Sequence, residues 1–236
     1  MANDYFKFKQ FTVHQERCAM KVGTDGTLLG AWAQVPEEQS RILDIGTGTG
    51  LIAMMMAQRF PQADIVGIDI DKDAVEQASE NVMNSPFSER INICQKDVSR
   101  MEDADGFDAI VCNPPYFVGS LRCPDEQRTI ARHTVSLTYK NLTKSAYRLL
   151  KKEGLFSLVI PMEKHSELEA LARMEGFFPS RVCLVKTTPL KAPKRQLIEF
   201  TKLPVNKIYK KEVVIELSPN KRSPWYQALT QEFYIK

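Results

Sequence analysis

The tetrapeptide Asn113-Pro114-Pro115-Tyr116 holds the residue types best suited to chemistry in this chain. Each proline fixes φ and removes a backbone donor, so carbonyl oxygens are left free to accept hydrogen bonds. The side chain of Asn113 offers a further oxygen, and the ring of Tyr116 offers a flat face for stacking. Two rigid acceptors can take both hydrogens of a planar –NH₂ group. We therefore expect Asn113, Pro114, Pro115 and Tyr116 to be catalytic residues that hold an exocyclic planar amine.

Such a site explains how a weak nucleophile can react. The lone pair of an adenine or amide nitrogen is delocalised, and two acceptors that pull on its hydrogens push the nitrogen toward tetrahedral geometry. The lone pair then becomes free to attack a methyl group in line, without prior deprotonation. Catalysis would rest on positioning and acceptor placement and not on a histidine base. The simpler alternative is a turn that only ends a strand, as Asn-Pro often does.

A glycine-rich segment, Leu43 to Gly50, indicates what the amine would react with. Its glycines, Gly46, Gly48 and Gly50, have the spacing G-x-G-x-G, which differs from the G-x-G-x-x-G of dinucleotide enzymes, and no P-loop lysine follows. Asp44 precedes the first glycine and would be a poor neighbour for a pyrophosphate but a good one for a cation. S-adenosylmethionine carries an ammonium and a sulfonium, so the segment favours this cofactor over NAD.

Two further acids follow later strands. Asp69, with Ile70 beside it, stands where an acid can bind the ribose hydroxyls of an adenosine cofactor. Asp97, with Val98 beside it, could accept from the adenine amine while a backbone N–H meets the ring. Each acid alone could be a helix cap or turn residue. Three acids after three successive strands, together with the glycine loop, indicate a cofactor site.

Short apolar segments alternate with helical ones and must position these residues. The expected strands are 41–45, 64–70, 91–96, 107–112 and 154–160, and the expected helices are 50–59, 72–84, 138–150 and 162–175. This alternation predicts a doubly wound α/β sheet that binds ligands at the carboxyl ends of its strands. Strands near 181–186, 196–202 and 212–217 predict an antiparallel finish, followed by a helix over 223–233. We expect a mostly parallel seven-stranded sheet with an antiparallel final strand and helices on both faces.

The glycine loop and the acids resemble the class I methyltransferases, which share a Rossmann-like fold and use S-adenosylmethionine. The resemblance covers most of 41–160 and implies that the glycine loop packs against the methionine part, that Asp69 takes the ribose and that the region of Asp97 frames the adenine. The tetrapeptide resembles that of amino-group methyltransferases acting on adenine, guanine or glutamine side chains. It also implies a role for Asn113 beside the cofactor.

Two terminal stretches resemble a narrower family. Residues 8–13 and 18–32 at the start, and 223–234 at the end, are similar to bacterial enzymes that methylate N6 of the adenine 3′ of the anticodon in tRNA(Val). This resemblance implies an RNA substrate. It also implies that 21–32 covers the methionine end of the cofactor, with Lys21, Thr24 and Asp25 close to it. The simpler alternative for Thr24 or Asp25 is the N-cap of a helix.

Charge is distributed unevenly along the chain. Residues 181–236 carry 12 Lys and Arg against 4 Asp and Glu, a balance of +8, whereas the remainder has a balance of −5. Such asymmetry indicates a polyanion partner or a solvated lysine-rich surface. The candidate contacts to the RNA backbone are Lys191, Lys194, Arg195, Lys210 and Lys211. Arg132 and His133 could contact phosphate or the flipped base, or form a solvated loop pair.

Composition bounds the remaining expectations. The 236 residues suffice for one domain, with an N-terminal cap over 1–36, a cofactor-binding and catalytic core over 37–180, and basic strands and a helix over 181–236. No segment reaches the ~20 apolar residues that span a bilayer. The five cysteines are widely spaced, which argues against a disulfide framework or a zinc site. We expect a cytoplasmic monomer or weak oligomer without a metal.

Two other functions compete with RNA methylation. A protein glutamine-N5 methyltransferase would use the same tetrapeptide, although the terminal stretches argue against it. A nucleic-acid-binding protein with a vestigial cofactor site is disfavoured because Asp44, Gly46, Gly48, Asp69 and Asn113 are all intact.

Overall fold

The structure is a computed structural model that describes residues 3–18, 20–115 and 137–235. Its strands are β1 (Tyr5–Lys7), β2 (Thr12–His14), β3 (Arg41–Ile45), β4 (Asp64–Asp69), β5 (Ile91–Gln95), β6 (Phe107–Cys112), β7 (Leu150–Pro161), β8 (Phe178–Lys186), β9 (Arg195–Thr201), β10 (Tyr209–Val214), β11 (Glu216–Ser218) and β12 (Lys221–Arg222). Its helices are α1 (Thr24–Trp32), α2 (Leu51–Arg59), α3 (Lys72–Met83), α5 (Tyr139–Leu149), α6 (His165–Glu175) and α7 (Pro224–Thr230), with short 3₁₀ turns η1 (Ser88–Arg90) and η2 (Met162–Lys164). The elements expected between residues 41 and 175 are all present, with bounds that differ by a few residues.

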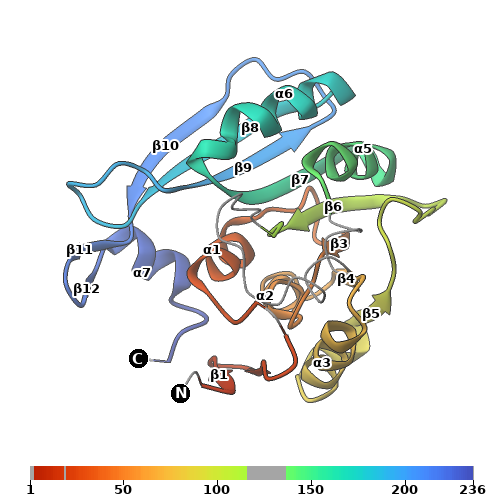
Figure 1. Cartoon of the computed structure of the whole chain (residues 1–236), viewed down its shortest axis with the longest axis horizontal. Helices are drawn as coiled ribbons and strands as arrows, with labels where there is room; N and C mark the ends of the chain where they lie inside the picture. The colour runs from red at the N-terminus through yellow and green to blue at the C-terminus, as the bar shows by residue number, and fades with distance from the viewer. Residues whose placement is uncertain (1–2, 19, 116–136, 236) are drawn as a thin grey trace, which may run out of the picture.

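One sheet runs through the molecule, in the order β10-β8-β9-β7-β6-β3-β4-β5 (Figure 1). The strands from β5 to β7 in this order are parallel, and helices α2, α3 and α5 return the chain from β3 to β4, from β4 to β5 and from β6 to β7. One apolar cluster packs α1, α2 and α7 on one face, and a second packs α5 and α6 on the other. The expected layered α/β architecture is confirmed.

The end of the sheet differs from the expectation in strand number and direction. Among the described residues the central sheet has eight strands instead of seven, and its antiparallel strand is β9, which lies between β7 and β8. The last strand, β10, is parallel to β8. Short connections reverse the chain after β8 and again after β9, so β10 regains the direction of β8. The predicted strand over 212–217 is split between β10 and β11.

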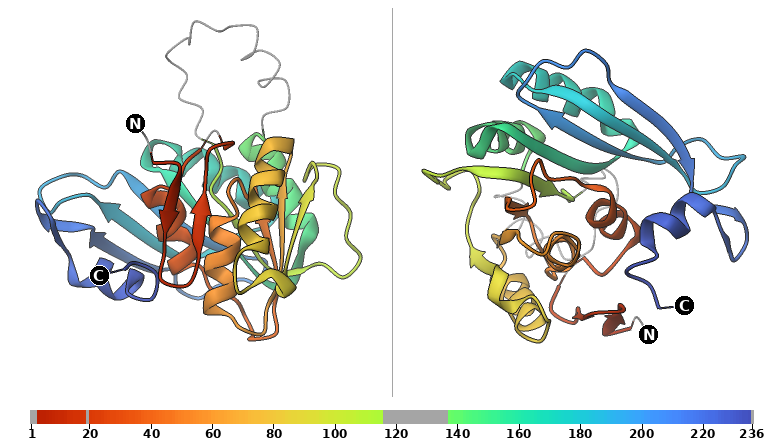
Figure 2. Two further views of the ribbon diagram at one scale, coloured as in Figure 1. Left: turned by 90° about the horizontal axis from the view of Figure 1, so that it is seen from below. Right: turned by 180° about the vertical axis from the view of Figure 1, so that it is seen from behind.

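The two terminal stretches lie side by side, as both views in Figure 2 show. The backbone N–H of Lys9 donates to the carbonyl of Phe233 at 2.8 Å. The ring of Phe8 stacks on Tyr234 with centroids 5.9 Å apart, and the hydroxyl of Tyr234 lies 3.1 Å from that of Tyr226. These contacts join the hairpin β1–β2 to the segment after α7. Residues near the two ends of the chain are therefore packed against each other.

Helix α1 packs closely on α2 through two glycines. A Cβ at Gly26 would lie 3.2 Å from Leu51, and a Cβ at Gly30 would lie 2.9 Å from the Cβ of Met55. Contacts below 3.0 Å require one helix to move. The spacing Gly26 to Gly30 is one helical turn, so both face α2. The absence of side chains there sets how close α1 comes to the sheet edge.

We predict that Gly30→Ala lowers the free energy of unfolding by about 1–3 kcal/mol, because the added methyl group forces α1 away from α2. Urea denaturation of the purified variant measures this loss. Gly23→Ala is the control, since a Cβ there would meet only the carbonyl of Lys21 at 3.7 Å, and its loss should be limited to the smaller cost of alanine at the N-cap of α1. Equal losses in the two variants would show that the approach of α1 to α2 is not tight.

Candidate active site

The register of three neighbouring strands places the proposed site residues in one row. Ile45 of β3 pairs with Ile68 of β4 on one side and with Cys112 of β6 on the other. The residues that follow these three are Gly46, Asp69 and Asn113. Neighbouring strands are about 4.8 Å apart, so the row spans about 10 Å from Asp69 to Asn113. The glycine loop lies in the middle of the row, as a shared site for cofactor and amine requires.

The glycine loop leaves its backbone open toward the ligand side. Gly46, Gly48 and Gly50 have φ of 71°, 55° and 80°, the left-handed region that favours glycine. A Cβ at Gly46 would meet nothing within 4 Å, whereas a Cβ at Gly50 would lie 3.4 Å from Ala78 of α3. The first glycine therefore borders open space, and the last allows close packing of α3.

Asp69 holds the loop and keeps capacity to bind a ligand. Its Oδ2 accepts from the N–H of Gly48 at 3.0 Å, and its Oδ1 accepts from the N–H of Asp71 at 3.0 Å. A carboxylate has about four lone-pair sites, so both oxygens can accept further hydrogen bonds from ribose hydroxyls. The neighbouring Ile70 is 47% exposed, which leaves an apolar surface beside this carboxylate. Both features fit the adenosine part of the cofactor.

Asp44 is fully buried under the loop. Its Oδ2 accepts from the hydroxyl of Thr47 at 2.7 Å and from the N–H of Ala53 at 3.2 Å. Its Oδ1 is buried and has no hydrogen-bond partner among the described residues. The pKa of the Asp44 carboxyl is raised to about 7. Burial is the main cause and the charge of Asp69 adds to it, whereas the two hydrogen bonds act in the opposite direction. An orphaned, destabilised carboxylate oxygen fits a site that receives a cation.

Asp97 has a local role in the structure. Its Oδ1 accepts from the N–H and the hydroxyl of Ser99, at 2.8 and 2.7 Å, which is the turn arrangement considered as the alternative. Its other oxygen lies 3.8 Å from Nε of Arg100. The side chain of Val98 packs in the core, so only its backbone could meet an adenine ring. The adenine assignment of this pair stays a prediction.

The tetrapeptide is described only in part. Asn113 is half-buried, Pro114 is buried and Pro115 is exposed. A Cβ at Gly26 of α1 would lie 4.0 Å from Nδ2 of Asn113, so α1 lies next to this side chain. Tyr116 lies outside the described residues, as do Arg132 and His133. The position of Asn113 at the end of β6 agrees with its proposed role as an acceptor.

Three of the proposed cofactor residues, Lys21, Thr24 and Asp25, lie just before or at the start of α1. Helix α1 begins after Gly23, which is its N-cap without a side-chain hydrogen bond, so the alternative of Thr24 or Asp25 as N-cap is wrong. Lys21 and Thr24 are exposed. Asp25 accepts from Nε of Arg195 at 2.7 Å, which joins a proposed cofactor residue to a proposed RNA residue.

The segment before α1 also contains a buried thiol. Cys18 is buried, and its pKa is raised to about 11 by burial first and then by the charges of Asp69 and Asp71. The negative charges of Asp69 and Asp71 therefore act on the thiol of Cys18.

Two buried amides of α3 form hydrogen bonds with residues 14–17, and one of them also bonds to the glycine loop. Asn81 accepts from the N–H of His14 at 2.9 Å and donates to the carbonyls of His14 and Thr49 at 2.8 and 2.9 Å. Gln77 accepts from the N–H of Arg17 at 3.3 Å. Neither amide was predicted from the sequence to be buried, because polar residues on an amphipathic helix ordinarily face water. Their position among the apolar residues of α3 was the only available signal.

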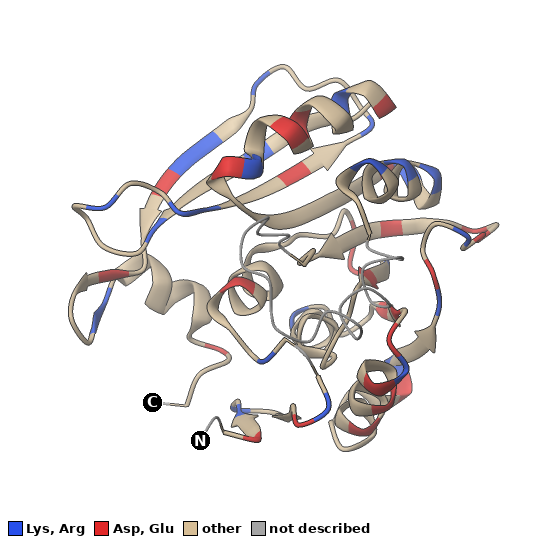
Figure 3. Cartoon of the chain, viewed as in Figure 1, with Lys and Arg blue, Asp and Glu red and all other residues tan. Residues whose placement is uncertain are grey.

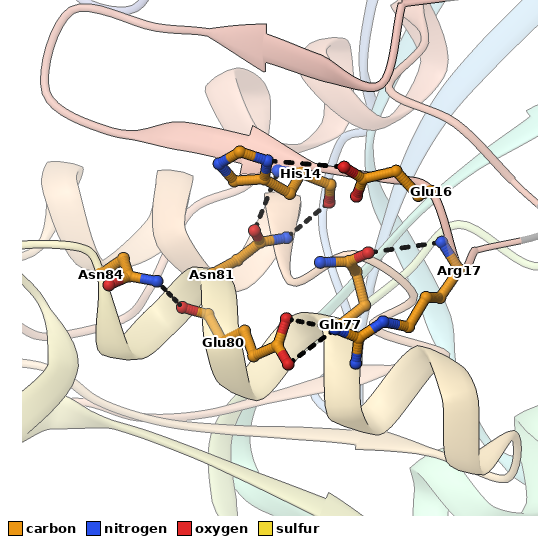
Figure 4. A pocket seen from close by; sticks show the side chains of 7 residues that line it. All are labelled: His14, Glu16, Arg17, Gln77, Glu80, Asn81 and Asn84. Carbon is orange, nitrogen blue, oxygen red and sulfur yellow. Dashed lines mark hydrogen bonds and ion pairs between the residues drawn. The ribbon is translucent and has the colours of Figure 1, made fainter.

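A shallow pocket of about 280 Å³ lies beside these amides (Figure 4). Its residues are His14, Glu16, Arg17, Gln77, Glu80, Asn81 and Asn84. Most are already paired with one another; Arg17 and Glu80 form two hydrogen bonds of 2.7 Å. The pocket lies along the second half of α3 and does not include Asp69, Gly46 or Asn113.

The proposed RNA residues of the C-terminal part are spread over two places. Lys191 and Lys194 are exposed in the β8–β9 connection, at the carboxyl edge of the sheet, where the N–H of Met162 donates to the carbonyl of Lys194. Lys210 and Lys211 are exposed on β10, at the far edge of the sheet. Four strand spacings, about 19 Å, separate β10 from β6.

We predict that the pH dependence of folding stability reports the buried state of Asp44. Its pKa rises from 3.8 to about 7 on folding, so the folded protein holds a proton between these values that the unfolded chain has released. The contribution of Asp44 to the free energy of unfolding therefore falls as the pH rises through this window. Denaturation of the wild type and of Asp44→Asn at pH 4 to 8 measures it. The amide of the variant does not titrate, so the difference in the free energy of unfolding between the two proteins should change with pH. A difference that stays constant from pH 4 to 8 would contradict the raised pKa of Asp44.

No helix within the described ranges has the length and apolar character needed to cross a membrane. The same residues contain no group of three or more His, Cys, Asp or Glu side chains arranged to hold a metal ion.

Comparison with known proteins identifies the family. Residues 23–188 match the family described as methyltransferase small domain. The chain is 50% identical to a Bacteroides thetaiotaomicron protein named tRNA1(Val) (adenine(37)-N6)-methyltransferase, over 100% of this chain and 99% of that protein. A protein of the same name from Tolumonas auensis is 44% identical, over 100% and 99% of the two chains.

Solved structures share the fold at low identity. A predicted O-methyltransferase from Agrobacterium tumefaciens has a TM-score of 0.72 and 19% identity, over 89% of this chain and 96% of that one. A Listeria monocytogenes protein described as a putative class I S-adenosylmethionine-dependent methyltransferase has a TM-score of 0.60 and 14% identity, over 86% of this chain and 65% of that one. The row of Asp69, Gly46 and Asn113 thus lies in a class I methyltransferase fold. By its family match and its full-length relatives, the chain belongs to the methyltransferase small domain family, within the group of tRNA1(Val) (adenine(37)-N6)-methyltransferases.

Proposed function

We propose that this methyltransferase transfers the methyl group of S-adenosylmethionine to the N6 amine of an adenine in tRNA. The observation that carries the proposal is the row at the strand ends, where the glycine loop stands between Asp69 and Asn113. The narrower substrate, adenine 37 of tRNA(Val), rests on relatives of that name that match the whole chain at 44–50% identity.

In the proposed complex the protein binds the cofactor at two places, the ribose and the amino-acid part. Asp69 would accept hydrogen bonds from the ribose hydroxyls, and Asp44 with the glycine loop would receive the cationic amino-acid part. An ammonium near Asp44 lowers the pKa of that carboxyl, which compensates the cost of its burial. Helix α1, held against α2 by Gly26 and Gly30, would close the site over this part. The cofactor supplies an electrophilic methyl group.

The chain's own part in the reaction is to hold the amine. Asn113 Oδ1 and the carbonyl of Pro114 would accept its two hydrogens, which frees the nitrogen lone pair for attack. Tyr116 would stack on the base. The base must leave the anticodon loop stack, which costs a few kcal/mol, and stacking on an aromatic ring offsets part of that cost. The methylated nitrogen then releases a proton to solvent.

The remaining features of the proposal follow from this substrate. We propose a single domain in which residues 1–36 act as a cap, 37–180 as the core and 181–236 as a basic extension. The protein would act in the cytoplasm, as a monomer or weak oligomer and without a metal.

We predict that the wild type, incubated with labelled S-adenosylmethionine and total tRNA, forms N6-methyladenosine. Mass analysis of the digested nucleosides identifies the product. Label in glutamine of a co-purified protein, with none in nucleosides, would instead support the glutamine-N5 methyltransferase. Cofactor binding without any transfer to tRNA or protein would support the vestigial site.

We predict that Asn113→Ala lowers the turnover about 100- to 1000-fold, as the loss of one preorganised transition-state hydrogen bond does. Single-turnover assays with tRNA measure this effect, and calorimetry should find nearly unchanged cofactor affinity. Asn206→Ala is the matched control, because Asn206 is exposed in the connection before β10. Wild-type turnover in Asn113→Ala would eliminate the acceptor mechanism.

A further inference from the structure

Helix α5 carries a continuous basic face. Lys140, Lys144 and Arg148 are exposed and spaced by four residues, so they follow one another along the same side of the helix at about 6 Å per step. The opposite side buries Leu142, Ala146 and Leu149 in the second apolar cluster. Lys151 and Lys152 extend the charge, and residues 137–152 contain five Lys and Arg and no Asp or Glu. Lys and Arg are therefore more frequent in residues 137–152 than in residues 181–236.

The charge of this face is only weakly neutralised. Within the described ranges, Lys140 and Lys144 form no ion pair, and Lys151 pairs with Asp108 at 2.8 Å. Arg148 donates to the carbonyls of Val98 and Ser99, which carry no net charge.

The neighbouring helix α6 gives the contrast, because Glu169 there pairs with Arg173 at 2.8 Å and with His165 at 3.3 Å. In Figure 3, α5 carries blue segments and no red ones, whereas α6 carries both.

The basic face begins at the edge of the sheet that holds the proposed site. Helix α5 connects β6 to the parallel strand β7, so its first turn lies on the side where β6 ends. Tyr139 in that turn is half-buried, and its pKa is raised by burial, then by Glu167 and then by Cys112, the residue before Asn113. From there Lys140 to Arg148 extend away along the helix. Lys210 and Lys211, in contrast, lie four strands from β6.

We propose that the face of α5 formed by Lys140, Lys144 and Arg148 binds the sugar-phosphate backbone of the RNA next to the target adenine. The proposal rests on the proposed function, and it adds a contact surface that the charge of the C-terminal part did not indicate. Basic side chains release counterions from phosphates and position the RNA without reading its sequence. A membrane surface is a poorer partner, because the exposed residues of α5 include no large apolar side chain to insert.

The test is the salt dependence of tRNA binding by full-length protein, measured by fluorescence anisotropy of a labelled tRNA(Val) transcript between roughly 50 and 200 mM salt. Lys140→Gln/Lys144→Gln is compared with Lys207→Gln/Lys221→Gln. The second pair removes the same charge from exposed lysines that precede and follow β10. The α5 variant should bind more weakly and reduce the slope of log Kd against log salt by about two, one for each lost phosphate contact. The control should keep the wild-type slope.

Three outcomes would overturn the inference: an unchanged slope in the α5 variant, equal losses in both variants, or no binding of tRNA by the wild type. Cofactor affinity, measured by calorimetry, should be the same in all three proteins, which shows that the variants fold. The binding assay does not depend on turnover. If the wild type binds tRNA but forms no N6-methyladenosine, the proposed function fails while the role of α5 is still decided.

Discussion

The register among β4, β3 and β6 is the constraint on which the rest of the structure depends. Ile68, Ile45 and Cys112 pair across the three strands, so the residues after them stand side by side at the sheet edge. A shift of one residue in any pair would turn every following side chain to the opposite face. The apolar strands buried on both faces, with β3 and β6 almost fully buried, fix this register. The packed core therefore sets the distance between the ribose-binding acid and the amine acceptor.

The same core also buries a carboxyl group of the site, which lowers the stability of the fold. Asp44 is a carboxyl group in β3 with no exposure to water, and hydrogen bonds from Thr47 and Ala53 compensate only part of its desolvation. Such a group is retained at the expense of stability when it serves a ligand. Helix α1 packs on α2, the helix that follows the loop, through Gly26 and Gly30, and Asn81 of α3 donates to the carbonyl of Thr49 in the loop. Rigid walls around a destabilised carboxyl are consistent with a preorganised site for a cation.

Local sequence patterns predicted the centre of the fold well. The strands from 41 to 112 and the glycine loop follow from apolar runs and from glycine chemistry, which are local signals. Contacts between distant segments were not predictable: the bond from Lys9 to Phe233, the pair Asp25–Arg195 and the burial of Asn81 depend on tertiary packing. The direction of β10 was predicted wrongly, because the order of strands in space does not follow from the order in the chain. The basic face of α5 was missed because charge was summed over long stretches, whereas the helix gathers a few residues on one side.

The central claim is that the cofactor and the amine meet on the row of Asp69, Gly46 and Asn113. A crystal structure with bound S-adenosylhomocysteine tests it most directly. The account predicts the ribose hydroxyls on Asp69, the amino-acid part over Gly46 and the sulfur facing the side chain of Asn113. A ligand whose ribose lies away from Asp69, or whose sulfur faces away from Asn113, would contradict it.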